Sequence, residues 1–175
     1  WDDPAWAGLA SLVLQLSLTA WWRHVGIAPD VVLGQGVGEL AAAATAGILT
    51  TDDVLHLVED RGRGNGAPRR DVLRPRTASL PFVSTLDGKP HSGTDLDAAH
   101  WPACLRSPGD LTTAVEALAG RGVDACLEIG PASLIERIAR LAQPGSPPVA
   151  IPSLLPANAH GGIALSAMGA LYAVG

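Results

Sequence analysis

The stretch VVLGQGVGEL, residues 31–40, decides the fold of this chain. A short β-branched run, Val31–Leu33, leads into the glycine-rich turn Gly34–Gly38, and the alanine-rich segment Glu39–Ala46 follows. The order of strand, G-x-x-x-G turn and helix is typical of a nucleophile elbow, in which a sharp turn presents a reactive side chain at the start of a helix. The flanking glycines permit the strained backbone, and the helix start stabilises a developing negative charge.

The apex of this turn carries no nucleophile, because it is Gly36 and the residue before it is Gln35. Glycine has neither a hydroxyl nor a thiol, so residue 36 cannot attack a thioester. Two phosphate-binding motifs also fail: Glu39 stands where G-x-G-x-x-G needs a glycine, and no Lys-Ser/Thr pair follows for a P-loop. A purely structural glycine turn is the remaining alternative, with the same consequence for the backbone.

Hydrophobic periodicity predicts helices and strands in alternation around the turn. The expected helices cover Pro4–Val25, Glu39–Ala46, Thr51–Arg61, Ser107–Gly120, Ala132–Ala142 and Gly162–Val174. The expected strands cover Val31–Leu33, Leu80–Leu86, Ala125–Ile129 and Val149–Leu154. The segment GRGNGAPRRDVLRPR, residues 62–76, interrupts the pattern as a loop or linker. The alternation implies an α/β fold with a mostly parallel sheet and helices on both faces.

Composition narrows the class of protein. The 175 residues are 47% hydrophobic and 17% charged with a net charge of −5, which argues against disorder and against a nucleic-acid partner. Residues 4–22 are uncharged and just long enough to raise the question of a membrane span, but their helical leucine spacing favours a buried helix. Cys104 and Cys126 form no disulfide framework and predict a reducing, cytoplasmic compartment. The five histidines have no zinc-site spacing, so no metal is expected.

Several segments carry a resemblance to a known family. WWRHVGIAPDVVLGQGVGELAAAATAGILTTDDVLHLVEDRGR, residues 21–63, resembles the acyltransferase domain of modular polyketide synthases and the related malonyl-CoA:acyl-carrier-protein transacylases. LRPRTASLPFVSTLDGKPHSGTDLDAAHW (73–101), LEIGPASLIERI (127–138) and ALSAMGALYAVG (164–175) resemble later parts of that family, in the family's order. The resemblance implies that residues 1–175 form a single domain, the α/β-hydrolase-like large subdomain of the acyltransferase fold.

The catalytic positions of the family are not kept in this chain. The family's nucleophilic serine falls at Gly36, and the histidine beside it falls at Gln35. The ferredoxin-like small subdomain, which carries the catalytic histidine, is expected to be missing, with its junction at about residues 62–76. A common family asparagine falls at Cys104, and a common family histidine falls at Ala132.

Two sets of arginines remain as candidate site residues. Arg61 stands where the family's arginine would hold a malonyl carboxylate, which predicts a vestigial substrate site. The preferred alternative is an arginine that complements the negative end of its helix, because no small subdomain would close the pocket. Arg69, Arg70 and Arg74 are predicted to form a docking patch for an acidic carrier protein. The alternative is that they only solubilise an exposed loop.

The expected function follows from the resemblance together with these departures. We expect no enzyme but an inactive acyltransferase-like domain of a polyketide synthase, with a structural, scaffolding or docking role beside the ketosynthase. One alternative is an acyl-CoA:acyl-carrier-protein transferase or hydrolase that a partner completes in trans. Another is a ligand-binding domain that uses the glycine turn for an anion. The expected partners are the ketosynthase and other synthase domains, an acyl carrier protein or a trans-acting acyltransferase, with no cofactor, metal, nucleic acid or membrane.

Overall fold

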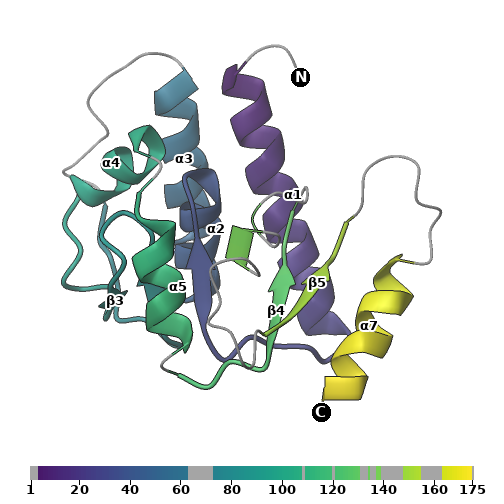
Figure 1. Cartoon of the computed structure of the whole chain (residues 1–175). Coiled ribbons are helices and arrows are strands. Elements are labelled where there is room, and N and C mark those ends of the chain that lie inside the picture. The colour runs from purple at the N-terminus through teal and green to yellow at the C-terminus, as the bar shows by residue number, and fades with distance from the viewer. Residues whose placement is uncertain are drawn as a thin grey trace. The chain divides into compact units, whose positions relative to one another are not determined.

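The computed structural model describes residues 4–62, 73–107, 109–119, 121–130, 134, 137–138, 148–154 and 163–174. The chain divides into two compact units, residues 1–114 and 115–175, and the division falls inside helix α5, Leu111–Ala119 (Figure 1). Each unit combines helices with strands and is described separately below.

The first unit is built around a three-stranded sheet. Its elements before α5 are α1 (Pro4–His24), β1 (Val32–Gly34), α2 (Val37–Thr45), α3 (Thr51–Gly62), β2 (Phe82–Ser84), β3 (Pro90–His91) and α4 (His100–Arg106). Strands β1 and β2 are parallel, with Val32 opposite Phe82 and Gly34 opposite Ser84. Strand β3 pairs antiparallel to β2 and places His91 opposite Phe82. The sheet order β1-β2-β3 brings the ends of β1 and β2 together beside the start of α2.

Helices α1, α2 and α3 pack against one another beside this sheet (Figure 1). The alanines of α2 make the packing close: Ala41, Ala42 and Ala43 are all buried, and their small side chains let neighbouring backbones approach. Larger side chains fill the remaining volume, with Trp101 and Phe82 both fully buried and their rings 6.5 Å apart. This core holds the start of α2 in place from several directions.

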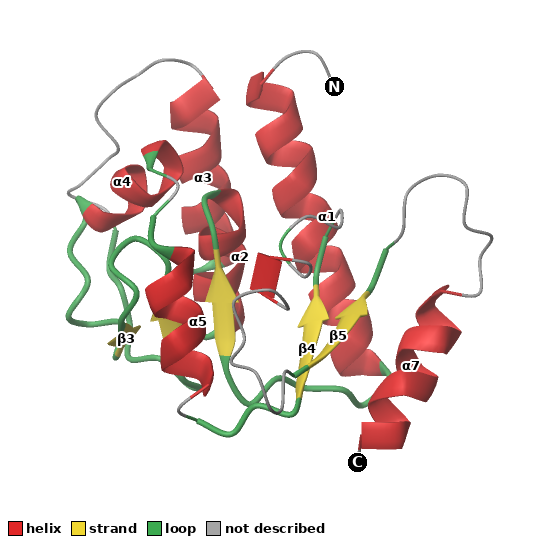
Figure 2. Ribbon diagram, in the orientation of Figure 1, coloured by secondary structure: helices red, strands yellow, loops and turns green. Residues whose placement is uncertain are grey.

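The second unit contains a parallel pair of strands and a helix (Figure 2). Strand β4, Ala125–Glu128, pairs with β5, Val149–Pro152, and α7, Ile163–Val174, contacts β5. Beyond the last rung of this ladder, the backbone N–H of Ser153 donates to the carbonyl of Glu128 at 3.1 Å, which extends the pairing by one residue.

The predicted α/β class with mostly parallel strand pairing is confirmed, and most predicted elements lie where expected. Helix α2 begins at Val37, two residues before the predicted start. The predicted helix Ser107–Gly120 begins only at Leu111, because Ser107 is extended and Gly109 has a positive φ of 64°. The short helix α4 was not predicted.

Two sequence predictions cannot be compared with the structure in full. Most of the predicted helix Ala132–Ala142 and residues 63–72 of the predicted junction lie outside the described residues. Within the described part of the chain, no helix is both long enough and apolar enough to span a bilayer.

Candidate functional site

The turn between β1 and α2 has the backbone of a sharp elbow. Gly36 is the N-cap of α2, with φ 59° and ψ −121°, a conformation that L side chains rarely adopt. Gly34 is required for a different reason: a Cβ there would lie 2.1 Å from the carbonyl oxygen of Gly38. The two glycines therefore allow the strand end and the helix start to approach closely.

The apex of the elbow faces open space. A Cβ built on Gly36 would meet no heavy atom of the described residues within 4 Å. The turn is closed by backbone hydrogen bonds from Gly38 N–H to Gln35 O at 2.9 Å and from Glu39 N–H to Gly36 O at 3.0 Å. The elbow is thus intact as backbone, while residue 36 supplies no atom that could attack a substrate.

A buried carboxylate lies one turn into α2. The side chain of Glu39 is 0% exposed, and its Oε1 accepts hydrogen bonds from Ser84 Oγ at 2.5 Å and from His100 Nε2 at 2.8 Å. Its Oε2 accepts from Thr85 N–H at 3.2 Å and from Thr85 Oγ1 at 3.0 Å. Thr85 Oγ1 also lies 2.9 Å from the carbonyl oxygen of Gly34. This network, Glu39 with Ser84, Thr85 and His100, joins both sides of the elbow to the end of β2 and to α4.

Helix α4 carries the second polar contact with the elbow. The thiol of Cys104 lies 3.1 Å from the carbonyl oxygen of Trp101 and 4.0 Å from that of Gly36. Burial, followed by the negative charge of Glu39, raises the pKa of the Cys104 thiol far above its usual range. Cys104 is therefore a protonated, packed thiol at neutral pH and not a nucleophile.

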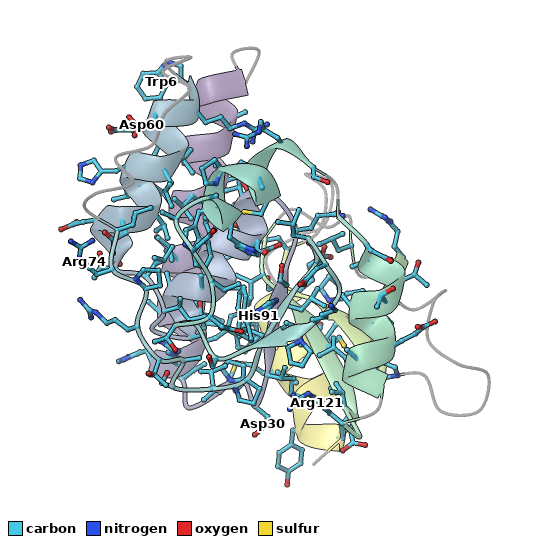
Figure 3. All side chains as sticks on the ribbon, turned by 90° about the vertical axis from the view of Figure 1, so that its left-hand side faces the viewer. Trp6, Asp30, Asp60, Arg74, His91 and Arg121 are labelled. Atoms are coloured by element: carbon cyan, nitrogen blue, oxygen red, sulfur yellow. The ribbon has the colours of Figure 1, made fainter. Side chains whose placement is uncertain are left out.

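Of the predicted arginines, the structure describes Arg61 and Arg74. Arg61 is exposed in the last turn of α3. Arg74 is exposed, and its Nη1 donates to the carbonyl of Leu73 at 3.2 Å (Figure 3). Arg69, Arg70 and Ala132 lie outside the described residues.

No metal site is present in the described part of the chain, where no group of three His, Cys, Asp or Glu side chains could hold an ion. His91 instead forms ion pairs, with Nδ1 2.9 Å from Asp95 and Nε2 3.1 Å from Asp87. Burial alone would lower the pKa of His91, but the hydrogen bonds and charges of the two aspartates outweigh it and raise that pKa.

Sequence reasoning missed the polar network around Glu39. His100 has no role in the expectations from the sequence, and in the structure its ring lies edge-on to Trp101 with centroids 5.0 Å apart. The contact between His100 and Glu39 joins residues 61 positions apart in the chain. The one available signal was the acidic residue Glu39 at the start of an otherwise apolar helix.

Comparison with known proteins gives the class of this chain. No family model matches it. Over 112 residues it is 32% identical to the non-reducing polyketide synthase afvB of Aspergillus flavus, a match that covers 64% of this chain and 6% of that protein. Over 128 residues it is 33% identical to the spectinabilin polyketide synthase system protein NorC of Streptomyces orinoci, covering 71% of this chain and 6% of that protein. The matched part of the chain therefore spans about 6% of the length of these curated relatives.

Solved structures give the fold. The acyltransferase domain from the second module of the salinomycin polyketide synthase aligns with 98% of this chain and 60% of its own, at 19% identity and a TM-score of 0.85. The acyl transferase domain of SpnD, solved in complex with 2-(pent-4-yn-1-yl)malonyl, aligns with 100% of this chain and 63% of its own, at 19% identity and a TM-score of 0.87. Fold and sequence together define the chain as an acyltransferase-like domain of the polyketide synthase type.

One expectation from the sequence is wrong. We expected the chain not to be an enzyme, because Gly36 and Gln35 replace the family's serine and histidine. The structures that share its fold are acyltransferase domains of polyketide synthases, which are transferases. The expectation of a non-enzyme therefore conflicts with the transferase domains whose fold this chain shares.

Proposed function

We propose that this chain takes part in acyl transfer between thioesters during polyketide assembly, as the elbow-bearing part of an acyltransferase domain. One observation carries the proposal: the sharp turn is present as backbone, with Gly36 at φ 59°, Gly34 in such close contact that a Cβ would lie 2.1 Å from the carbonyl oxygen of Gly38, and no described atom within 4 Å of a Cβ at position 36. A turn of this kind aims backbone N–H groups and the positive end of α2 at a developing oxyanion.

In this proposal, residue 36 never carries the acyl group. Gly36 has no side chain, and the nearby thiol of Cys104 is buried with a raised pKa. The attacking group then comes from outside residues 1–175 or from the substrate pair itself. If the attacking group comes from another polypeptide, the chain is a transferase that a partner completes in trans. Arg61, exposed in the last turn of α3, is left as a vestigial contact for a substrate carboxylate.

We further propose that the ferredoxin-like small subdomain is missing and that residues 62–76 mark its junction. The alignment supports this: nearly all of this chain matches only 60–63% of the solved acyltransferase domains. A domain without that part still offers a structural surface beside a ketosynthase.

A docking role for the patch Arg69, Arg70 and Arg74 is a second proposal, supported by the exposure of Arg74. A cytoplasmic location is proposed on the two free cysteines, Cys104 and Cys126.

The decisive experiment maps where an acyl group goes. The chain in its natural polypeptide is incubated with malonyl-CoA and the cognate carrier protein, and each protein is digested and analysed by mass spectrometry. We expect malonyl on the carrier protein and no covalent adduct within residues 31–40. An adduct in that segment would contradict the role given to Gly36. Carrier loading that stays unchanged when residues 1–175 are deleted would contradict the proposed function as a whole.

A further inference from the structure

The buried carboxylate of Glu39 fixes the state of one histidine. Its two oxygens face Ser84 Oγ, His100 Nε2 and the N–H of Thr85, and also Thr85 Oγ1, whose single proton is shared between Glu39 and the carbonyl of Gly34. A carboxylate with this many donors acts purely as an acceptor. With Glu39 ionised, its 2.8 Å contact with His100 requires the proton on Nε2 of that ring, and the neutral ring then has its lone pair on Nδ1.

The ring of His100 is fixed by its neighbours, but one of its two nitrogens makes no hydrogen bond within the described part of the chain. Its side chain is 10% exposed, and its ring lies edge-on to Trp101 and tilted against His91, with ring centroids 5.0 Å and 5.9 Å away. The hydrogen bonds among the described residues engage Nε2 and the backbone N–H of His100, and none engages Nδ1. The ring thus offers one acceptor nitrogen in an orientation that buried groups determine.

The neighbouring His91 provides the contrast. Both of its nitrogens are occupied, Nδ1 by Asp95 and Nε2 by Asp87. It has no nitrogen left to accept a proton from a further group. Of these two packed histidines, only His100 has the arrangement of a general base oriented by a carboxylate.

His100 also lies on the side of α4 that meets the elbow. Cys104 follows it by four residues, so both side chains project from the same face of that helix. The thiol of Cys104 lies 4.0 Å from the carbonyl oxygen of Gly36, and Glu39 belongs to the first turn of the helix that Gly36 caps. Helix α4, which carries His100, therefore contacts the elbow through Cys104, and His100 itself contacts the first turn of α2 through Glu39.

We propose that His100, oriented by Glu39, is the proton-accepting group for direct exchange of an acyl group between two thiols at the elbow. The proposal rests on the proposed function. Nδ1 of His100 takes the proton of the acceptor thiol, such as the thiol of a pantetheine arm, and the thiolate attacks the carbonyl carbon of an acyl-CoA. The tetrahedral intermediate collapses, the bond from carbon to the CoA sulfur breaks, and the leaving thiolate takes the proton back from the imidazolium. The carboxylate of Glu39 stabilises the imidazolium in between.

Direct exchange agrees with the glycine at position 36. A protein-bound acyl intermediate needs a side chain there, whereas direct exchange needs room for two substrates at once. On the protein's side, no described atom lies within 4 Å of the place that a side chain at position 36 would take. The sequence of steps needs no oxidant, metal or cofactor, and the acyl acceptor is a second substrate.

The test compares His100→Gln with His91→Gln in the natural polypeptide. Glutamine at position 100 can still donate to Glu39 but cannot accept a proton, so the buried network keeps a donor. The assay follows malonyl transfer from malonyl-CoA to pantetheine between pH 5 and pH 9. We expect His100→Gln to lower the rate about 100-fold or more and to flatten its rise with pH, and His91→Gln to stay within about twofold of wild type.

Each result decides one question. If His100→Gln transfers malonyl at the wild-type rate and with the same pH profile, this inference is overturned and the proposed function still stands. Absence of transfer in the wild type overturns both. If His100→Gln fails to fold, the ¹⁵N NMR signals of the wild-type ring decide: a proton on Nε2 with a bare Nδ1 supports the inference, and a proton on Nδ1 in the neutral ring overturns it.

Discussion

Glycine occupies two neighbouring positions of the elbow for two separate reasons, and each has its own consequence. At Gly36 the reason is the backbone angle. A side chain would meet no described atom there, but the φ of 59° is one that residues with a Cβ rarely adopt. At Gly34 the reason is contact, since a Cβ would lie 2.1 Å from a backbone oxygen. The sequence shows glycine at both positions, but the physical requirement differs: a positive φ at position 36 and the absence of a Cβ at position 34.

Alanine substitutions separate the two reasons. Gly36→Ala is expected to cost about 1–3 kcal/mol of unfolding free energy, the range for a strained backbone angle. Gly34→Ala is expected to cost more, above about 3 kcal/mol, because backbone rather than a flexible side chain must move. Urea unfolding of both variants measures the difference. Equal costs would show that the elbow relaxes easily at Gly34.

The ion pairs of His91 predict a pH-dependent contribution to stability. The raised pKa of His91 means that its stabilisation is complete below its ordinary value of 6.5 and is lost as the pH rises through the raised value. Burial tends to raise the pKa values of Asp87 and Asp95, but the hydrogen bonds from His91 outweigh it and lower them below 3.8. Their contribution is therefore lost only as the pH falls through those lowered values.

His91→Gln should thus be most destabilising between about pH 4 and 6.5, by about 0.5–1 kcal/mol, as is usual for exposed ion pairs. The destabilisation should nearly vanish at pH 9. Thermal unfolding of wild type and variant at pH 5.5 and pH 9 provides the measurement. An equal loss at both pH values would mean that the ring acts only by packing.

At the scale of single elements, α3 begins with a reciprocal cap. Asp53 Oδ2 accepts from the N–H and the hydroxyl of Thr50 at 2.9 and 2.6 Å, and Asp53 N–H donates to Thr50 Oγ1 at 3.1 Å. These bonds satisfy two donors that the first turn would otherwise leave open. They set the start of the helix that carries Arg61 at its other end.

Removing this cap should weaken α3 measurably. Thr50→Ala is expected to lower the unfolding free energy by about 1 kcal/mol. Thr51→Ala is the matched control, because Thr51 is the exposed next residue of the same type, and its change should stay within about 0.5 kcal/mol. Chemical denaturation compares the two. A control that loses as much as Thr50→Ala would show that the cap contributes little.

The elements also show what sequence patterns can and cannot predict. The elbow was predictable because its signal is local: a β-branched run, closely spaced glycines and an alanine-rich helix. Helix α4 was not, since its seven residues HWPACLR are too few for a period and contain Pro102. The network of Glu39 was not predictable either, because the partners lie 45 to 61 residues away and only the folded chain brings them together.

At the scale of the whole molecule, buried apolar side chains are unevenly divided between the two units. The hydrophobic core cluster consists of residues between Leu12 and Leu105, all in the first unit. Among the described residues of the second unit, the buried hydrophobic side chains are Val115, Leu118, Ile151 and Ala167. Since burial of apolar surface drives folding, the first unit holds most of the stabilising interactions that the structure describes.

This division predicts that a fragment of residues 1–120, which keeps all of α5, folds without the rest of the chain. It should unfold cooperatively in urea and keep the circular dichroism of α1 to α5, because its core cluster is complete. The complementary fragment 121–175 should show no cooperative transition, since a chain of that length with few buried apolar side chains is marginal. Parallel urea titrations of both fragments and of the full chain measure this. A cooperative transition in 121–175, or none in 1–120, would contradict the division, whereas the expected result would identify the first unit as the part that holds the elbow in shape.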